Sequence, residues 1–118
     1  MKASRYFTEK ELSCPHCGLN NITDELIDKL TEARDIYGKA IVINSGTRCQ
    51  EHNATLGSKP TSSHTNGTAV DIRVTASSDR SKLLVVLLAL GFSRIGIASS
   101  FLHVDLDENK AKNVIWVY

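Results

Sequence analysis

The chain of 118 residues lacks several features that mark large classes of protein. Its 14 Lys and Arg residues exceed its 13 Asp and Glu residues by one, so it has no strong basic field for nucleic-acid phosphates or anionic lipid. The longest apolar run, the eight residues Leu83 to Leu90, is far too short for a membrane span. No apolar segment follows the first residues, so no secretory signal is recognised. We therefore expect a single domain over residues 1–118, made in the cytoplasm, that neither inserts into membranes nor binds nucleic acid.

Two helices are predicted by the spacing of apolar residues. Residues 23–37 carry an apolar stripe at helical spacing, with Thr23 as the N-cap. A second helix should begin at a cap formed by Ser78 or Asp79 and run to Leu90. Because apolar residues surround it almost completely, we expect this second helix to be buried.

The remaining elements are short. A capping-box sequence at Thr8 to Glu11 predicts one short helical turn. The polar stretch 44–66 has neither helical nor strand periodicity, so we expect it to be irregular. This order of elements predicts an α+β fold, with a small antiparallel sheet packed by helices. The expected strands cover residues 40–43, 68–74, 95–98, 101–106 and 114–118, with the last three antiparallel to one another.

Two histidines and an aspartate have the types and spacing of a catalytic zinc site. His64 precedes Asp71 by a short loop that contains Gly67, and His103 falls on a later predicted strand. Two neutral imidazoles and one carboxylate are ligands of catalytic zinc, and they leave the ion an open position and about one net positive charge. From residue types alone the alternative is ordinary: Asp71 caps a turn, and the histidines are surface or core residues.

The three cysteines are too few for a disulfide framework, but they form a second possible metal site. Cys14 and Cys17 have CxxC spacing, and Cys49 and His52 have CxxH spacing. Three thiolates and one imidazole would make a closed structural zinc site that pins the N-terminal segment to the loop around Arg48. The alternatives are a disulfide between Cys49 and an N-terminal cysteine, or free thiols.

Three blocks of the sequence resemble the zinc D-Ala-D-Ala carboxypeptidase family, in the family's order. The most specific is SxHxxGxAxD at residues 62–71, followed by HxD at 103–105. The segment SGTRCxxHN at 45–53 and the opening FxxxELxCxxCG at 7–18 are similar to the small carboxypeptidase branch. The family includes D-alanyl-D-alanine carboxypeptidases and dipeptidases and phage L-alanyl-D-glutamate endopeptidases, and it shares its fold with the Hedgehog signalling domain.

The resemblance implies a Hedgehog/DD-peptidase-like fold and a zinc-dependent hydrolase that acts on the stem peptides of bacterial peptidoglycan. Separately, we expect the protein to be a monomer. It implies that His64, Asp71 and His103 are the zinc ligands. It also implies that Arg48 binds substrate and polarises the scissile carbonyl or holds a carboxylate. Since this substrate lies outside the membrane and no export signal is recognised, we expect either a phage or prophage protein that is released on lysis or carried in the virion, or a protein exported by a signal-bearing partner or an unusual route.

One position departs from the family pattern. Many members carry Glu or Asp three residues before the second histidine as the general base, whereas this chain has Ser100, which cannot take a proton at neutral pH. Asp105 lies on the same side of the predicted strand as His103, so it would either act as the catalytic base or hold His103 in its tautomer. Glu51 or Asp107 would be other sources of the base. Ser100 also leaves open a non-catalytic zinc module, structural or wall-binding, of a phage particle.

Overall fold

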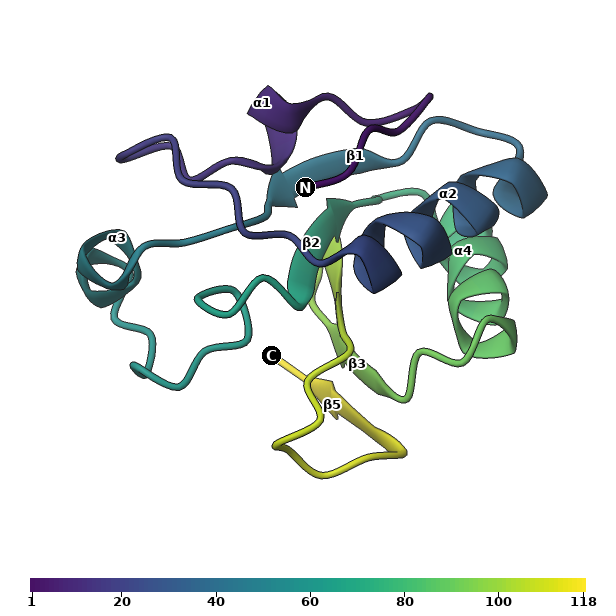
Figure 1. Ribbon diagram of the computed structural model, residues 1–118. Helices are drawn as coiled ribbons and strands as arrows, with labels where there is room; N and C mark the ends of the chain where they lie inside the picture. The colour runs from purple at the N-terminus through teal and green to yellow at the C-terminus, as the bar shows by residue number, and fades with distance from the viewer.

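The computed structural model describes residues 1–118 as an α+β fold, as predicted, with four helices and one five-stranded sheet in the order β1-β2-β4-β3-β5 (Figure 1). None of the helices has the length and apolar character needed to cross a membrane. The helices are α1 (Glu9–Leu12), α2 (Asp24–Tyr37), α3 (Gln50–Thr55) and α4 (Ser77–Ala89). The strands are β1 (Val42–Ser45), β2 (Ala69–Arg73), β3 (Arg94–Ile97), β4 (Phe101–Asp105) and β5 (Val114–Val117).

The sheet is antiparallel except at one edge, where the prediction for the last strand is wrong. β5 pairs with β3 in the parallel direction, from Arg94–Val114 to Ile97–Val117. β4 cannot accept β5, because β2 and β3 already occupy both of its edges. The chain after β4 therefore crosses to the free edge of β3 and runs parallel to it, which proximity in the sequence could not indicate.

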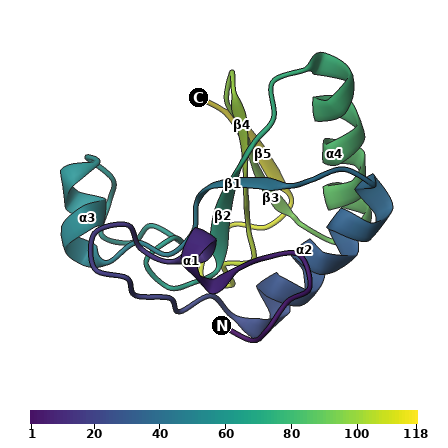
Figure 2. The ribbon, with the colours of Figure 1, turned by 90° about the horizontal axis from the view of Figure 1, so that it is seen from above.

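Helices α2 and α4 lie together on one side of the sheet (Figure 2). The core contains 19 buried residues, among them Val70 and Ile72 of β2 and Leu102 and Val104 of β4. Side chains alternate along a strand, so the residues between these point to the opposite face of the sheet. That opposite face carries Asp71 and His103.

Local signals predict α2 correctly. The Thr23 side chain accepts a hydrogen bond from the Leu26 N–H at its start, and Gly38 ends it with a φ of 77°. Leu26 and Leu30 of its apolar stripe are fully buried in the core. The capping box of Thr8 and Glu11 at the start of α1 is also present.

The expectation that α4 is buried is wrong. Leu83 and Leu87 face the core, but Val85 is 62% exposed because nothing packs on the outer side of this helix. The predicted cap is also wrong: the helix begins at Ser77 without a side-chain cap. Asp79 instead lies 2.7 Å from the Lys39 ammonium.

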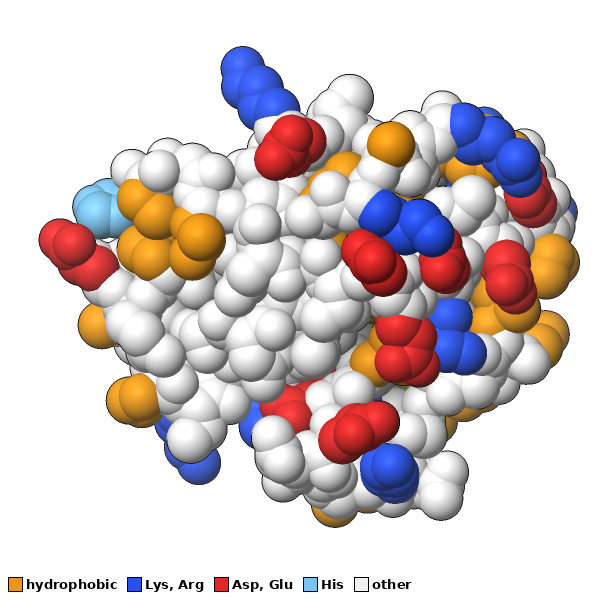
Figure 3. All heavy atoms as spheres, viewed as in Figure 1, with side chains coloured by type: hydrophobic (Ala, Val, Ile, Leu, Met, Phe, Trp, Pro, Cys, Tyr) orange, Lys and Arg blue, Asp and Glu red, His pale blue; other side chains and the backbone are white.

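The polar stretch 44–66 contains the short helix α3, which periodicity did not predict. α3 lies on the other side of the sheet from α4 (Figure 2). Cys49 is its N-cap, and the thiol accepts a hydrogen bond from the His52 N–H. Charged side chains of both signs are mixed over the α2 side of the molecule (Figure 3), in keeping with the near-neutral composition.

Candidate metal centre

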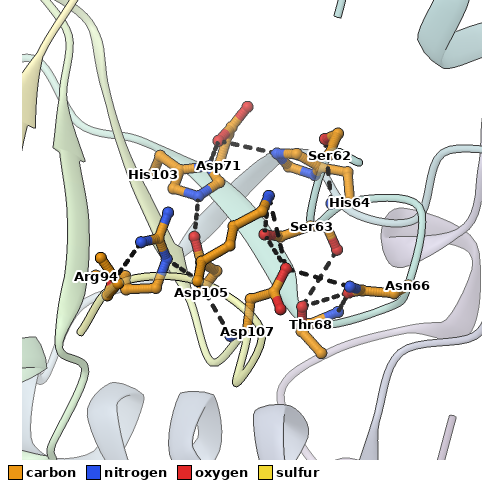
Figure 4. Close-up of polar contacts among 12 residues, drawn as sticks. Ser62, Ser63, His64, Asn66, Thr68, Asp71, Arg94, His103, Asp105 and Asp107 are labelled. Atoms are coloured by element: carbon orange, nitrogen blue, oxygen red, sulfur yellow. Dashed lines mark hydrogen bonds and ion pairs between the residues drawn. The ribbon is translucent and has the colours of Figure 1, made fainter. Parts of the chain in front are cut away.

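The three predicted zinc ligands converge on the sheet face opposite α2 and α4. Asp71 of β2 and His103 of β4 stand directly opposite each other in the antiparallel ladder, and His64 reaches them from the loop before β2. Their ligand atoms all lie within 4.8 Å of one another, and all three residues are buried. Asp71 Oδ1 lies 2.9 Å from His103 Nδ1 and 3.3 Å from His64 Nε2 (Figure 4).

Each imidazole is oriented by a hydrogen bond on its outer nitrogen. His64 Nδ1 lies 2.8 Å from the Gly46 carbonyl, and His103 Nε2 lies 2.7 Å from Asp105 Oδ2. These acceptors assign the ring protons to the outer nitrogens, so both inner nitrogens turn a lone pair toward Asp71 Oδ1. Three acceptors in contact need a shared cation or extra protons between them, and this donor set fits zinc with one open position.

Burial and contacts with neighbouring groups shift the pKa values of Asp71 and His103 in opposite directions. Burial would raise the pKa of Asp71, but hydrogen bonds and charge interactions with His103 and His64 outweigh it and hold that pKa well below its usual range. Burial would lower the pKa of His103, but hydrogen bonds to Asp105 and Asp71 raise it above the ordinary value. In the absence of metal, both shifts therefore favour a charged Asp71 carboxylate beside a protonated His103.

Asp105 contacts protein groups through both carboxylate oxygens (Figure 4). Oδ2 faces His103, while Oδ1 accepts hydrogen bonds from Arg94 Nε at 2.8 Å and from the Asp107 N–H at 3.1 Å. Burial would raise the pKa of Asp105, but these three partners keep it below the usual value. The residue is only 1% exposed, and its contact with Nε2 holds the outer edge of the His103 ring in place.

Ser100, at the family's usual base position, and the two alternative carboxylates, Asp107 and Glu51, lie apart from the three predicted ligands. Ser100 is exposed in the turn between β3 and β4. Asp107 is buried and accepts hydrogen bonds from Ser63 Oγ at 2.7 Å and Asn66 Nδ2 at 3.2 Å. The Glu51 side chain is 77% exposed, and its nearest charged partner is His16 Nε2 at 3.8 Å. Neither carboxylate is hydrogen-bonded to the three predicted ligands.

Arg48 is fixed next to the metal centre. Its Nη2 lies 3.5 Å from Asp71 Oδ2, and the side chain is 13% exposed. Nε donates to Ser45 Oγ at 3.2 Å, and Nη1 donates to Asn53 Oδ1 at 3.4 Å and Ser58 Oγ at 3.3 Å. These neutral acceptors orient the guanidinium without neutralising its charge, which leaves it able to bind an anionic or polarised oxygen.

Two hollows meet at this arginine. Cavities of about 1060 Å³ and about 470 Å³ are both lined by Arg48, Ser58, Asp71 and Phe101. His64 and His103 line the smaller one. A chain-like ligand that extends from one hollow into the other would cross the metal centre.

Sequence reasoning missed two residues that support the site. They are Trp116 and Arg94, and the half-buried Trp116 ring lies 5.4 Å from the His103 ring, between centroids. Gly96 makes this possible, because a Cβ there would lie 2.6 Å from Trp116 Nε1. Arg94, which holds Asp105, also lies 5.1 Å from the Trp116 ring. Only the strand register brings these residues together.

The cysteine cluster is separate from this centre. The sulfur atoms of Cys14, Cys17 and Cys49 lie within 4.8 Å of one another, and His52 is outside that group. The nearest imidazole contact is His16 Nδ1, 3.4 Å from Cys49 Sγ. Burial would raise the pKa of Cys14, but N–H groups of Cys49, Cys17 and His16 point at its sulfur and lower that pKa to about 7.

A family model described as Peptidase M15 matches residues 5–107. The match includes Arg48, the three predicted zinc ligands and Asp105. A search of curated proteins finds no significant match.

Proposed function

The chain belongs to the Peptidase M15 family, and we propose on that premise that it is a zinc peptidase acting on the stem peptides of bacterial peptidoglycan. The family membership makes it a metallopeptidase. The substrate and the bond, cut in the manner of a D-Ala-D-Ala carboxypeptidase or an L-Ala-D-Glu endopeptidase, are the proposal. The observation that carries it is the convergence of His64, Asp71 and His103 beside Arg48, where two hollows meet.

We assign His64, Asp71 and His103 as the zinc ligands. When bound, zinc supplies a Lewis acid that activates water and polarises the scissile carbonyl. The Gly46 carbonyl and the Asp105 carboxylate hold the two imidazoles with their inner nitrogens toward Asp71. Such outer partners keep a ligating histidine in the required tautomer and raise its basicity.

Arg48 is the residue we assign to substrate binding. Its guanidinium keeps an uncompensated share of charge, because Asp71 divides its own charge among Arg48, His64 and His103. A planar guanidinium beside the reacting bond binds a peptide carbonyl or a substrate carboxylate through paired N–H donors. The two hollows on either side of Arg48 would take the residues before and after the scissile bond.

For Asp105 we favour the positioning role over the role of catalytic base. To accept a proton from water, this carboxylate would have to leave His103, Arg94 or the Asp107 N–H. Its depressed pKa also makes it a weak proton acceptor. Holding His103 requires no such change, since the Nε2 contact of 2.7 Å already exists.

The test is digestion of purified muropeptides, with the products identified by mass. The zinc-loaded protein should release either D-alanine from the stem peptide or a peptide that begins with D-glutamate. His64→Ala should abolish cleavage, whereas Asp28→Asn, in a surface ion pair with Lys2, should not. A folded protein that binds zinc and cleaves no stem peptide at any pH would refute the enzyme proposal. It would support instead the non-catalytic phage zinc module that Ser100 leaves open.

A further inference from the structure

Three thiols from two distant segments meet at one point, and the proposed reaction uses none of them. Cys14 and Cys17 follow α1, and Cys49 caps α3. All three are free thiols, and their sulfur atoms lie within 4.8 Å of one another. Two imidazoles, His16 and His52, stand beside them with their rings stacked 6.4 Å apart, 8° from parallel.

We propose that Cys14, Cys17 and Cys49 hold a structural zinc ion, and that one imidazole of the stacked pair His16 and His52 completes its coordination. Nothing in this inference depends on the proposed peptidase reaction, because the two clusters share no residue.

The geometry fits a tetrahedral ion. With zinc–sulfur bonds of about 2.3 Å, neighbouring sulfurs in a tetrahedral site lie about 3.8 Å apart. The three sulfur atoms here all lie within 4.8 Å of one another, which is compatible with that spacing. A sulfur and an imidazole nitrogen lie about 3.6 Å apart in such a site, and His16 Nδ1 is 3.4 Å from Cys49 Sγ. His52 has the CxxH spacing and stacks on His16, but neither imidazole joins the three sulfurs within 4.8 Å, so one of the two rings would turn toward the ion to take the fourth position.

Backbone N–H groups already surround the sulfurs as they would surround thiolates. The Cys49 N–H lies 3.4 Å from Cys14 Sγ, and the His52 N–H lies 3.4 Å from Cys49 Sγ. Cysteine is not among the usual N-cap residues, so capping alone does not account for a cysteine at this position. At the other segment, Gly18 has a φ of 79° and donates to the Cys14 carbonyl at 2.8 Å. This tight turn returns Cys17 to the side of Cys14.

A zinc ion at this place would join the segment of Cys14 and Cys17 to the segment of Cys49, beside the larger hollow. Three thiolates and one imidazole leave no open position on zinc and about one net negative charge, which suits a structural ion. Cys49 follows Arg48 directly, and Cys14 and His52 line the larger hollow together with Arg48. An ion here would fix one wall of that hollow and the start of the segment that presents the guanidinium.

The decisive experiment removes the other metal site first. In the double variant His64→Ala/His103→Ala, we expect one zinc ion per chain to remain after desalting. Cobalt substituted into this variant should show a thiolate charge-transfer band, and Cys49→Ser added to it should abolish both signals. Loss of all zinc, with three thiols that react at once with a thiol reagent, would overturn the proposal. Two thiols that react only after reduction would also overturn it, since that result indicates a disulfide.

A second set of variants keeps all three thiols and so avoids the loss of the Cys49 cap. In the same background, either His16→Ala or His52→Ala should weaken zinc retention against a chelator by more than about tenfold, and the other should not. The variant lacking both imidazoles should retain zinc no better than whichever single variant retains it less well. Unchanged retention in that variant would refute the imidazole ligand. Muropeptide cleavage is measured separately in the chain that retains His64 and His103, so failure of the peptidase proposal leaves these results unaffected.

Discussion

Replacement of Asp105 by Asn distinguishes a positioning residue from a catalytic base. Asp105 Oδ1 accepts from both Arg94 Nε and the Asp107 N–H, so the amide oxygen of Asn must take that place. The amide NH2 then faces His103 Nε2 where Asp105 Oδ2 lies now, 2.7 Å away. Because an NH2 group only donates, His103 must accept at Nε2 and carry its proton on Nδ1. That proton points at Asp71, in the place a metal ion needs.

The expected magnitude follows from this reversal. Loss of an outer partner of a ligating histidine costs about 10-fold to 100-fold in metal affinity. The reversed tautomer should place Asp105→Asn at the upper end, a loss of about 2.7 kcal/mol at 1.36 kcal/mol per tenfold. Asp105→Ala imposes no wrong tautomer, so its loss of zinc affinity should be nearer tenfold.

The two variants should rank oppositely in stability. Asp105→Ala leaves the Arg94 side chain, 13% exposed, without its partner, and removal of one member of a buried ion pair costs about 3–5 kcal/mol. The amide oxygen of Asn still accepts from Arg94, so its cost should be smaller, about 1–3 kcal/mol. Zinc affinity is measured by competition with a chelator and stability by urea unfolding, with Asp28→Asn as the matched carboxylate-to-amide control.

Catalysis by Asp105 would give a different pattern. If Asp105→Asn binds zinc as tightly as the wild type but loses kcat, together with the acidic limb of its pH profile, Asp105 is the base. Equal zinc affinities for the Asn and Ala variants would also refute the tautomer argument, because that argument requires Asn to be the worse of the two.

Three further predictions concern the substrate arginine, pH and a turn. Arg48→Lys keeps the charge but loses the forked donors, so kcat/KM on muropeptide should fall about tenfold or more at unchanged zinc content, and an equal rate would contradict its role. The raised pKa of His103 stabilises the metal-free protein fully below about pH 6.5, and this contribution is lost as pH rises through the folded pKa. Relative to a chelator-treated His103→Gln variant, which keeps the opposing contribution of the lowered Cys14 pKa, the Tm of chelator-treated wild type should therefore fall as pH rises above about 6.5, while a relative rise would contradict the shift. The depressed pKa of Asp71 acts only at more acid pH. Gly67→Ala should cost about 2–5 kcal/mol in urea unfolding, because φ is +78° and a Cβ would lie 2.0 Å from the Asn21 carbonyl oxygen. Gly57→Ala, with φ of +71° and open space, should cost only about 1–2 kcal/mol, and equal costs would refute the steric argument.

The parts of the fold that sequence predicted are those decided locally. The apolar stripe, cap and terminal glycine of α2 all lie within or next to the helix. The direction of β5 and the exposure of Val85 depend instead on which sheet edge is free and on what packs against α4. Both depend on the folded chain as a whole, so no local sequence pattern could predict them. The helix α3 is too short for periodicity to reveal.

The same division holds in the metal centre. His64, Asp71 and His103 could be named because a specific spacing marks them and resembles a known family. Asp105 could be named as a partner of His103, because both lie on the same side of one strand, but Arg94 could not, because it meets Asp105 only through the pairing of β3 with β4. The Gly46 carbonyl has no side-chain signal at all, yet it orients His64.

The three proposed zinc ligands are held in place by different parts of the fold, and this decides how the two proposed metal sites could influence each other. Asp71 and His103 are fixed by a strand ladder whose other face is the core, so little outside the sheet can move them. His64 depends on the segment 46–48: its Nδ1 contacts the Gly46 carbonyl, and its own carbonyl accepts from the Arg48 N–H at 3.0 Å. That segment is also tied to the N-terminal part, since the Thr47 N–H donates to the Leu12 carbonyl at 2.9 Å. An ion bound between the segments that contain Cys14 and Cys49 would therefore act on His64 and Arg48, and much less on the two ligands of the sheet.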